Sequence, residues 1–328
     1  MLVREPQNTI RTWHTDTRIW CDFELRADDI LICTPPKTGT TWTQRIVSML
    51  LHQSAEPRPF IDEQPWLDAR FTPQAEIAEA LSQTPGVRSL KSHSPLTALP
   101  LHDDVLYINV ARDPRDAAMS FHNHATHYAA EFEETLDQSG LGDPQIARPY
   151  PRAPADARIS FRRWLRDPAC APFDDFTIAE FLELERSFWD ERHRPNVLLV
   201  HYNDLKADLA GEIRRIGEFC GIETPEQLMA QIVDAAGFSS MKRDGAKMLG
   251  VINVAFEGGA DTFLHKGTND RWKGVLTNGD LAEYRAVIEA SLPGDLAAWL
   301  EQGRLALEGD AAVDGGDAAS IAAERGAA

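Results

Sequence analysis

The chain has 328 residues, and its 33 lysines and arginines against 51 aspartates and glutamates give a formal net charge of −18. This acid excess excludes general binding to nucleic acid or to an anionic membrane surface, because both need a basic face. Hydrophobic residues make up 43% of the chain, enough for a sizeable core, and no apolar run approaches the roughly 20 residues that span a bilayer. The N-terminal stretch lacks a signal-peptide core and the cysteines show no CxxC spacing, so we expect a cytoplasmic protein with reduced thiols.

The first predicted unit is a strand, a loop and a helix between residues 30 and 52. The apolar run at 30–34 stops at Pro35-Pro36, and from Thr40 the apolar residues recur at helical spacing. Later apolar runs and helical patterns continue the alternation. In chain order we expect strands at 87–90 and 105–110, a helix from Pro114 to about 127, and a long excursion with short helices at 128–176. A helix at 177–192 and a strand at 197–200 follow, and then a helix from Asp204 to Gly221 and another after Pro225. The last predicted elements are an irregular glycine-rich stretch at 244–274 and a helix at 280–290.

This alternation is typical of an α/β fold with a central parallel sheet flanked by helices. We expect one domain over residues 1–308, with a phosphate-binding strand, loop and helix at its start. From Gly309 the chain has low complexity and few large apolar residues, so we expect a disordered tail at 309–328.

The loop after the first strand, residues 34–42, has the residues of a phosphate cradle. A glycine lets the backbone turn closely around an anion, and the N-terminus of the following helix points free N–H groups at it. Lys37 adds a mobile charge, and Thr40 and Thr41 add hydroxyl donors. The loop is not a Walker A motif, because its lysine precedes Gly39. An ordinary helix N-cap with a surface lysine is the alternative interpretation.

Two further clusters follow the next strands, where the ligands of an open parallel sheet gather. His93, within Lys-Ser-His-Ser-Pro, titrates near neutral pH and is either a general base or a surface histidine in a turn. Arg112 lies at a strand-to-helix turn with Ser120 two helical turns later. Arg112 could grip a phosphate, or could pair with Asp113 or Asp116.

These runs together resemble segments of the cytosolic-type sulfotransferases, which use 3′-phosphoadenosine 5′-phosphosulfate (PAPS) as sulfuryl donor. TPPKTGTTW is similar to the family's phosphosulfate loop, KSHSP to its segment with the catalytic histidine, and YINVARDPRDAAMSFHNH to its 3′-phosphate motif. HYNDLKAD, the run Phe238-Ser239-Ser240-Met241 and FLHKGTNDRWK match three later segments in the same order. Within the family, the chain most resembles actinobacterial small-molecule and glycolipid sulfotransferases.

The resemblance implies transfer of the sulfuryl group from PAPS to a hydroxyl of a small molecule, natural product or glycolipid, with release of PAP. His93 would take the hydroxyl proton, Lys37 would stabilise the bridging oxygen of the leaving group, and Lys91 would lie near the transferring group. The donor would be held by Thr38, Gly39, Thr40 and Thr41 at the 5′ phosphate, by Arg112, Ser120, Lys266 and Gly267 at the 3′ phosphate, and by Trp42, Tyr202, Phe238 and Met241 around the adenine.

The chain departs from the family's pattern in its last segments. His265 stands where the family has an arginine before its Lys-Gly pair, so we expect a weaker contact with the 3′ phosphate. Asp270-Arg271 replaces a Gly-Asp pair and changes the charge of that loop, and Ala236 replaces a residue with a hydroxyl. Of the animal-type dimer signature only Lys273 and Thr277 remain, so that homodimer is not carried over.

His122, His124 and His127 suggest a metal site, but residues two apart on a helix face different sides and no thiolate or carboxylate set completes it. We therefore expect no metal, and histidines that line the acceptor pocket or face solvent. The acceptor should enter between residues 60–71, 121–170 and 244–265, which would cover the site and exclude water.

Two other functions stay open at this point. A nucleotide-dependent small-molecule kinase fits the strand, loop and helix, but the chain lacks a Walker A loop and has the Arg112/Ser120 pair. A non-catalytic PAP-binding protein fits the donor residues alone, and the presence of Lys37, Lys91 and His93 counts against it.

Overall fold

The computed structural model describes residues 1–166 and 176–307, and its centre is a four-stranded sheet. The strand order across the sheet is β3 (Ser89–Ser92), β2 (Ile30–Cys33), β5 (Leu106–Ala111) and β6 (Val197–His201). Each neighbouring pair is parallel. The carboxyl ends of these strands therefore meet at one edge, where the loops that follow them lie together.

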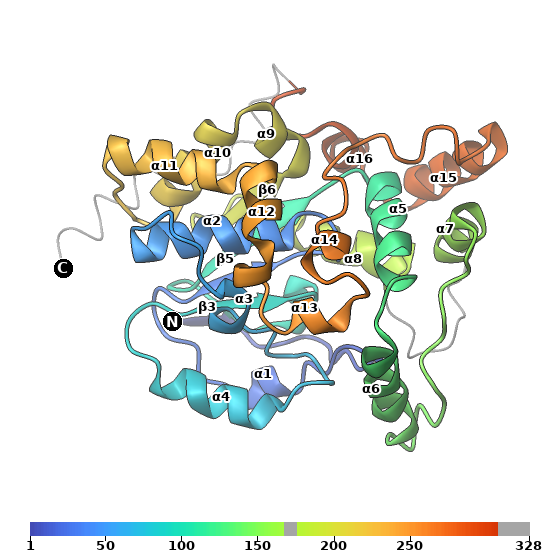
Figure 1. Cartoon of the computed structure of the whole chain (residues 1–328), viewed down its shortest axis with the longest axis horizontal. Coiled ribbons are helices and arrows are strands. Elements are labelled where there is room, and N and C mark those ends of the chain that lie inside the picture. Colours follow the sequence, from blue (N-terminus) through green and yellow to red (C-terminus); the bar gives the residue numbers. More distant parts are fainter. Residues whose placement is uncertain (167–175, 308–328) are drawn as a thin grey trace.

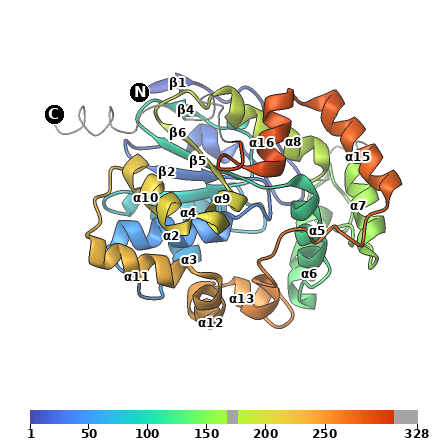
Figure 2. The ribbon, with the colours of Figure 1, turned by 90° about the horizontal axis from the view of Figure 1, so that it is seen from above.

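Helices cover both faces of this sheet, as predicted (Figure 2). Successive side chains of a strand point to opposite faces, so the sheet has a separate core on each side. One core contains Ile30 and Ile32, and the other contains Leu31 and Cys33. The first face is covered by α2 (Thr40–His52), α10 (Leu209–Phe219) and α11 (Glu226–Ala236), and the second by α5 (Pro114–Ala125), α7 (Ala157–Arg166), α8 (Ile178–Asp190), α15 (Asn278–Ser291) and α16 (Gly294–Gln302).

The remaining elements are short or lie at the edges of the sheet. β1 (Leu2–Arg4) pairs antiparallel with β4 (Leu101–His102) in a small second sheet. The other elements are α1 (Ile19–Asp22), α3 (Phe60–Glu63), α4 (Gln74–Gln83), the 3₁₀ helix η1 (Leu96–Ala98), α6 (Ala130–Leu141), α9 (Tyr202–Ala207), α12 (Phe238–Met248), α13 (Ile252–Ala255) and α14 (Ala260–Phe263). Figure 1 shows α12, α13 and α14, in orange, in front of the sheet between α2 and α5.

Three expected elements differ from the structure. β3 starts at Ser89 and includes Lys91 and Ser92, which pair with Ile32 and Cys33 of β2. The single helix expected from Asp204 is two helices, because Asp208 leaves helical geometry (φ −141°) and its carboxylate accepts a hydrogen bond from the Gly211 N–H, capping α10.

The third difference is the stretch 244–274, which is not irregular throughout. It contains the end of α12 and the whole of α13 and α14. Their apolar residues are too few to give a helical period in the sequence, but they pack into two small clusters, one with Tyr128 and Phe256 and one with Phe60 and Met248.

The expected tail at 309–328 lies outside the described residues, so that tail and the domain boundary at 308 stay predictions. Across residues 1–166 and 176–307, the structure has no helix with the length and apolar character needed to cross a bilayer.

Candidate active site

The loop between β2 and α2 is fixed in shape by its own contacts. Gly39 has a φ of 134°, and a Cβ added there would lie 3.1 Å from Val110, so glycine is required. Lys37 also has a positive φ, 71°. The hydroxyl oxygens of Thr34 and Thr40 lie 2.6 Å apart, which ties the start of the loop to the first residue of α2. The loop therefore leads directly to a helix N-terminus whose first N–H groups have no intrahelical partner.

The four residues predicted for the 5′ phosphate do not all face the same way. Gly39, Thr40 and Thr41 line the main cavity of the molecule, but Thr38 does not. Thr38 is buried, and its hydroxyl donates to the carbonyl oxygen of Pro35 at 2.9 Å. The Thr38 side chain therefore holds the loop and does not reach into the cavity.

Lys37 extends across the cavity to the opposite wall. Its Nζ lies 3.2 Å from His124 Nδ1 and 4.5 Å from the centre of the Phe263 ring. Burial, followed by the charges of Arg112 and Lys91, lowers the pKa of Lys37 to about 7. Burial also lowers the pKa of His124 well below its usual value. His124 is therefore neutral near pH 7, and its Nδ1 accepts a hydrogen bond from Lys37.

β3 brings Lys91 and His93 to the same cavity. His93 Nδ1 lies 2.6 Å from the carbonyl oxygen of Thr34, so Nδ1 donates its proton there and Nε2 keeps the lone pair. Burial, and then the charge of Lys91, lowers the pKa of His93 well below its usual value, which keeps the ring neutral. Burial lowers the pKa of Lys91 to about 8, and its Nζ lies 4.7 Å from the centre of the Trp66 ring.

Arg112 connects the Lys37 loop to the loop that follows α14. Its guanidinium donates to the carbonyl oxygens of Lys37 at 3.2 Å and Thr268 at 2.9 Å, and lies 4.0 Å from the centre of the Tyr202 ring. Arg112 is buried, and its Nε finds no hydrogen-bond partner among the described residues. Asp113, one of the two acidic residues that could have paired with Arg112, forms an ion pair with Arg115 at 2.6 Å.

The loop with His265, Lys266 and Gly267 also lines the cavity. Gly267 has a φ of 61°, and a Cβ there would lie 2.6 Å from the Phe238 ring, so glycine allows this close packing. Lys206 Nζ donates to the Gly267 carbonyl at 3.1 Å. His265 has a lowered pKa, first through burial and then through neighbouring cations.

The Asp270-Arg271 departure adds a cation to the cavity. The buried carboxylate of Asp116 accepts hydrogen bonds from the N–H groups of Asp270 at 2.9 Å and Arg271 at 2.8 Å. Arg271 lines the cavity, and burial and Arg112 lower its pKa. Arg271 was not predicted as a site residue, although it lies four residues after Gly267 and replaces an acidic residue of the family's pattern.

The residues predicted for the adenine lie together at one end of the cavity. The Trp42 indole donates to the Ala236 carbonyl at 2.8 Å, and its ring centre lies 5.5 Å from that of Tyr202. Phe238 is 39% exposed and Met241 is buried. A single cavity of about 1820 Å³ is lined by every predicted site residue except Thr38, namely Lys37, Gly39, Thr40, Thr41, Trp42, Lys91, His93, Arg112, Ser120, Tyr202, Phe238, Met241, His265, Lys266 and Gly267.

The other end of this cavity is aromatic, and we call it the acceptor wall because it includes residues of the segments expected to admit the acceptor. Its rings come from four separate parts of the chain and include Trp66, Phe71, Phe121, Tyr128, Phe132, Phe176, Phe256 and Phe263. His14 joins them from the N-terminal segment, with its ring centre 4.8 Å from that of Phe176. His14 and Phe176 were not predicted as site residues, because no local spacing in the sequence marks either of them.

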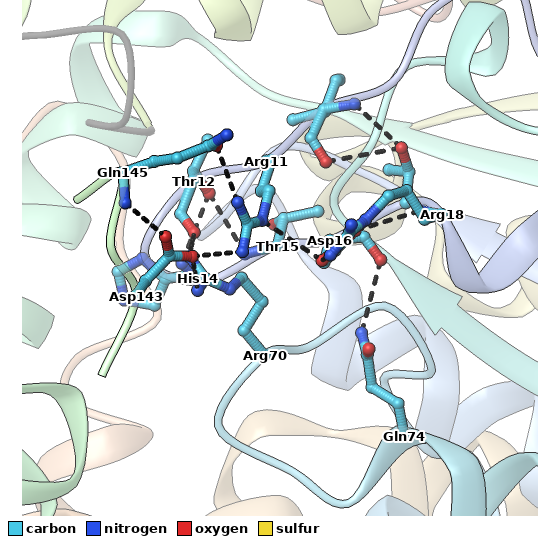
Figure 3. Close-up of polar contacts among 12 residues, drawn as sticks. Arg11, Thr12, His14, Thr15, Asp16, Arg18, Arg70, Gln74, Asp143 and Gln145 are labelled. Carbon is cyan, nitrogen blue, oxygen red and sulfur yellow. Dashed lines mark hydrogen bonds and ion pairs between the residues drawn. The ribbon is translucent and has the colours of Figure 1, made fainter. Parts of the chain in front are cut away.

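A polar network outside the acceptor wall holds the N-terminal segment in place (Figure 3). Asp143, after α6, forms ion pairs with Arg11 and with Arg70, the latter at 2.5 Å. The Arg70 N–H also donates to the carbonyl of His14 at 2.8 Å. These contacts fix His14 relative to the segment that contains Trp66.

The three histidines at the end of α5 do not form a common site. His124 faces Lys37, whereas His127 Nδ1 lies 2.7 Å from the Asn123 carbonyl. In the part of the chain that the structure describes, no group of three or more histidines, cysteines or acidic residues could hold a metal ion.

Comparisons with known proteins identify the family of the chain. The sulfotransferase domain family matches residues 27–297. A glycolipid sulfotransferase of Mycobacterium bovis (strain BCG / Pasteur 1173P2) is 31% identical over 310 residues, which are 90% of this chain and 94% of that protein. Sulfotransferase 1A1 of Rattus norvegicus is 27% identical over 264 residues, 78% of this chain and 81% of the relative. The crystal structure of retinol dehydratase with androsterone and inactive cofactor PAP matches with a TM-score of 0.65 at 20% identity, over 88% of each chain. The resemblance found in the sequence is confirmed: the chain belongs to the sulfotransferase family and is a sulfotransferase.

Proposed function

We propose that this sulfotransferase takes the sulfuryl group from PAPS and transfers it to a hydroxyl of a small molecule, natural product or glycolipid, releasing PAP. The observation that carries the proposal is the convergence of Lys37, Lys91 and His93 on one cavity that also contains Arg112 and the loop 265–267. The names of two similar proteins support it, since one is solved with PAP and the other is a glycolipid sulfotransferase.

The charges of the cavity fit a doubly phosphorylated nucleotide. Lys37, Arg112, Lys266 and Arg271 all line it, although the chain as a whole carries a net charge of −18. A few cations in a partly buried cavity attract a small anion whatever the global charge. In this proposal the N-terminus of α2 binds the 5′ phosphate, and the unpartnered Arg112 Nε belongs to the group that binds the 3′ phosphate.

His93 is the general base in this proposal. Its Nε2 takes the proton of the acceptor hydroxyl as the hydroxyl oxygen forms a bond to sulfur. The bond between sulfur and the bridging oxygen breaks, and its electron pair stays on that oxygen, which Lys37 stabilises. The anionic donor raises the pKa values of His93, Lys37 and Lys91 when it binds, because negative charge favours their protonated forms.

The test is incubation of the purified protein with PAPS and a panel of phenols, alcohols and glycolipids, with mass-spectrometric detection of sulfated products. We expect product from at least one acceptor class, and stabilisation in a thermal shift by PAP but not by ATP with Mg²⁺. Stabilisation by ATP with Mg²⁺ alone would reverse the proposal in favour of a kinase. Stabilisation by PAP without product from any acceptor would favour a non-catalytic PAP-binding protein.

A further inference from the structure

Asp68 lies directly behind the residues that the proposed chemistry uses. The segment 65–68 runs alongside β3: Trp66 and Lys91 form a parallel bridge, and the Lys91 N–H donates to the Pro65 carbonyl at 3.0 Å. This arrangement places the Asp68 carboxylate under the end of β3, where its side chain is fully buried.

The carboxylate of Asp68 accepts hydrogen bonds from both neighbours of His93. The Ser92 hydroxyl donates to Oδ2 at 2.7 Å and the Ser94 hydroxyl at 2.8 Å, while the Trp20 indole donates to the same oxygen at 3.0 Å. The Ser94 N–H donates in turn to the Ser92 hydroxyl at 3.0 Å. These bonds enclose the backbone of His93 from behind.

Asp68 is itself fixed from the opposite side by the N-terminal segment. The Asp16 N–H donates to the Asp68 carbonyl at 2.8 Å, and Thr15 and Ala69 form an antiparallel bridge. Asp16 and Arg70 belong to the polar network with Arg11 that Figure 3 shows. Asp68 is therefore held in place independently of the residues around His93, and it would not move with them if they were displaced.

Burial of a charged carboxylate is unfavourable for the free energy of folding. The buried Asp68 carboxylate therefore needs an explanation other than stability. Burial raises the pKa of Asp68 despite three donated hydrogen bonds, and Oδ1 finds no partner among the described residues. Since all three donors meet at Oδ2, that oxygen carries no proton. Its negative charge also opposes the lowering of the Lys91 pKa.

We propose that Asp68 is the positioning residue for His93: through Ser92 and Ser94 it holds the His93 backbone so that Nδ1 stays on the Thr34 carbonyl and Nε2 faces the acceptor hydroxyl. This inference rests on the proposed role of His93 as the base. A displacement of about 1 Å at a reacting group can cost on the order of 10²-fold in rate, which is the scale of effect expected when this support is removed.

The test compares Asp68→Ala, Asp68→Asn and the double variant Ser92→Ala/Ser94→Ala. Asp68→Ala and the double variant remove the hydrogen bonds and should lower kcat on the order of 10²-fold while leaving the Kd for PAP unchanged. Asp68→Asn keeps an acceptor oxygen for both serines and should recover most of kcat. If Asp68→Ala does not fold, the double variant tests the same proposal, because it removes the two serine hydrogen bonds and keeps the carboxylate.

A second readout is the ¹⁵N NMR signature of the His93 imidazole in the free protein, which needs no acceptor. The wild-type protein should show the tautomer with the proton on Nδ1, and Asp68→Ala and the double variant should show a mixture of tautomers. Asp204→Asn is the matched control, because Asp204 is also buried with a raised pKa and accepts from the Arg304 and Leu305 N–H groups at 2.9 and 3.1 Å. That control should lower stability without changing the tautomer or kcat.

The inference is overturned if folded Asp68→Ala or the double variant keeps the wild-type His93 tautomer, or loses no more kcat than Asp204→Asn. Its failure is distinguishable from failure of the proposed function. If the wild-type protein sulfates no acceptor, the proposed function fails, while the tautomer of His93 still shows whether Asp68 fixes that ring.

Discussion

The two ends of the cavity are constructed in different ways. We call the part of the cavity lined by the loops that follow β2, β3 and β5 the donor end. These loops lie side by side because the sheet is parallel and in register, so short runs of sequence place Lys37, His93 and Arg112 together. The acceptor wall has no such frame, because its rings come from distant segments that pack on one another, as Tyr128 and Phe256 do. An isolated antiparallel bridge joins these two residues. The donor end is therefore set by the sheet, and it meets the acceptor wall where Lys37 contacts Phe263 and Lys91 contacts Trp66.

The largest effect should come from His93, which lies where the two ends meet. Replacement by alanine removes the proposed base, so kcat should fall about 10²- to 10⁴-fold, the usual contribution of a general base. PAP affinity, measured by calorimetry, should stay unchanged, because the donor end is intact. Persistent transfer in His93→Ala would show that another group takes the proton.

The donor end should also give a clear pH dependence. The pKa of Lys37 is lowered to about 7 and that of Lys91 to about 8, so both are charged at pH 6 and lose their protons in turn as the pH rises. The value of kcat/KM for PAPS should therefore fall by about 25-fold from pH 7.5 to 8.5 if both charges are needed, since it reports the ionisation of the free enzyme.

Lys37→Arg is the matched control for this profile. Arginine keeps its charge over the whole range, so the part of the decline that begins near pH 7 should disappear, whatever the absolute rate of the variant. A wild-type profile that stays flat to pH 9 would contradict the assignment of these lysines to the anionic donor.

Replacement of Arg271, the cation that was not predicted, tests whether this side chain binds the donor. Arg271→Ala should raise the Kd for PAP about tenfold, because a hydrogen bond to a charged group contributes about 1.5–3 kcal/mol and this residue is partly exposed. Affinity for adenosine 5′-phosphosulfate, which lacks the 3′ phosphate, should change much less. Equal losses for both nucleotides would place Arg271 elsewhere on the donor.

The smallest effect should come from a single ring of the acceptor wall. Phe132 lies 5.5 Å from Phe71 and 5.1 Å from Tyr128 between ring centres. Phe132→Leu should change KM for an apolar acceptor several-fold, corresponding to about 1 kcal/mol of altered packing. The Kd for PAP should not change, and a parallel loss of PAP affinity would show that the two ends are coupled.

This contrast also explains how far the sequence could be interpreted. The donor residues lie in contiguous runs after strands, so their convergence follows from a parallel sheet. The hydrogen bond of the Thr38 hydroxyl to the Pro35 carbonyl and the place of Arg271 in the cavity were not predicted. His14 and Phe176 are far apart in the chain, and their meeting at the acceptor wall depends on the network around Asp143. Likewise, the break between α9 and α10 depends on the conformation of one residue, Asp208, inside a continuous apolar pattern.

The loop before α2 has a consequence for the time course of binding. The left-handed backbone at Lys37 and Gly39, the Thr34–Thr40 contact and the Arg112 hydrogen bond to the Lys37 carbonyl set its shape from within. A nucleotide that arrives there finds a preorganised surface, so little conformational entropy is lost in ordering the loop. We therefore expect association of the donor to be rapid and guided by charge, and the slow events of each turnover to lie in passage of the acceptor or product along the aromatic wall.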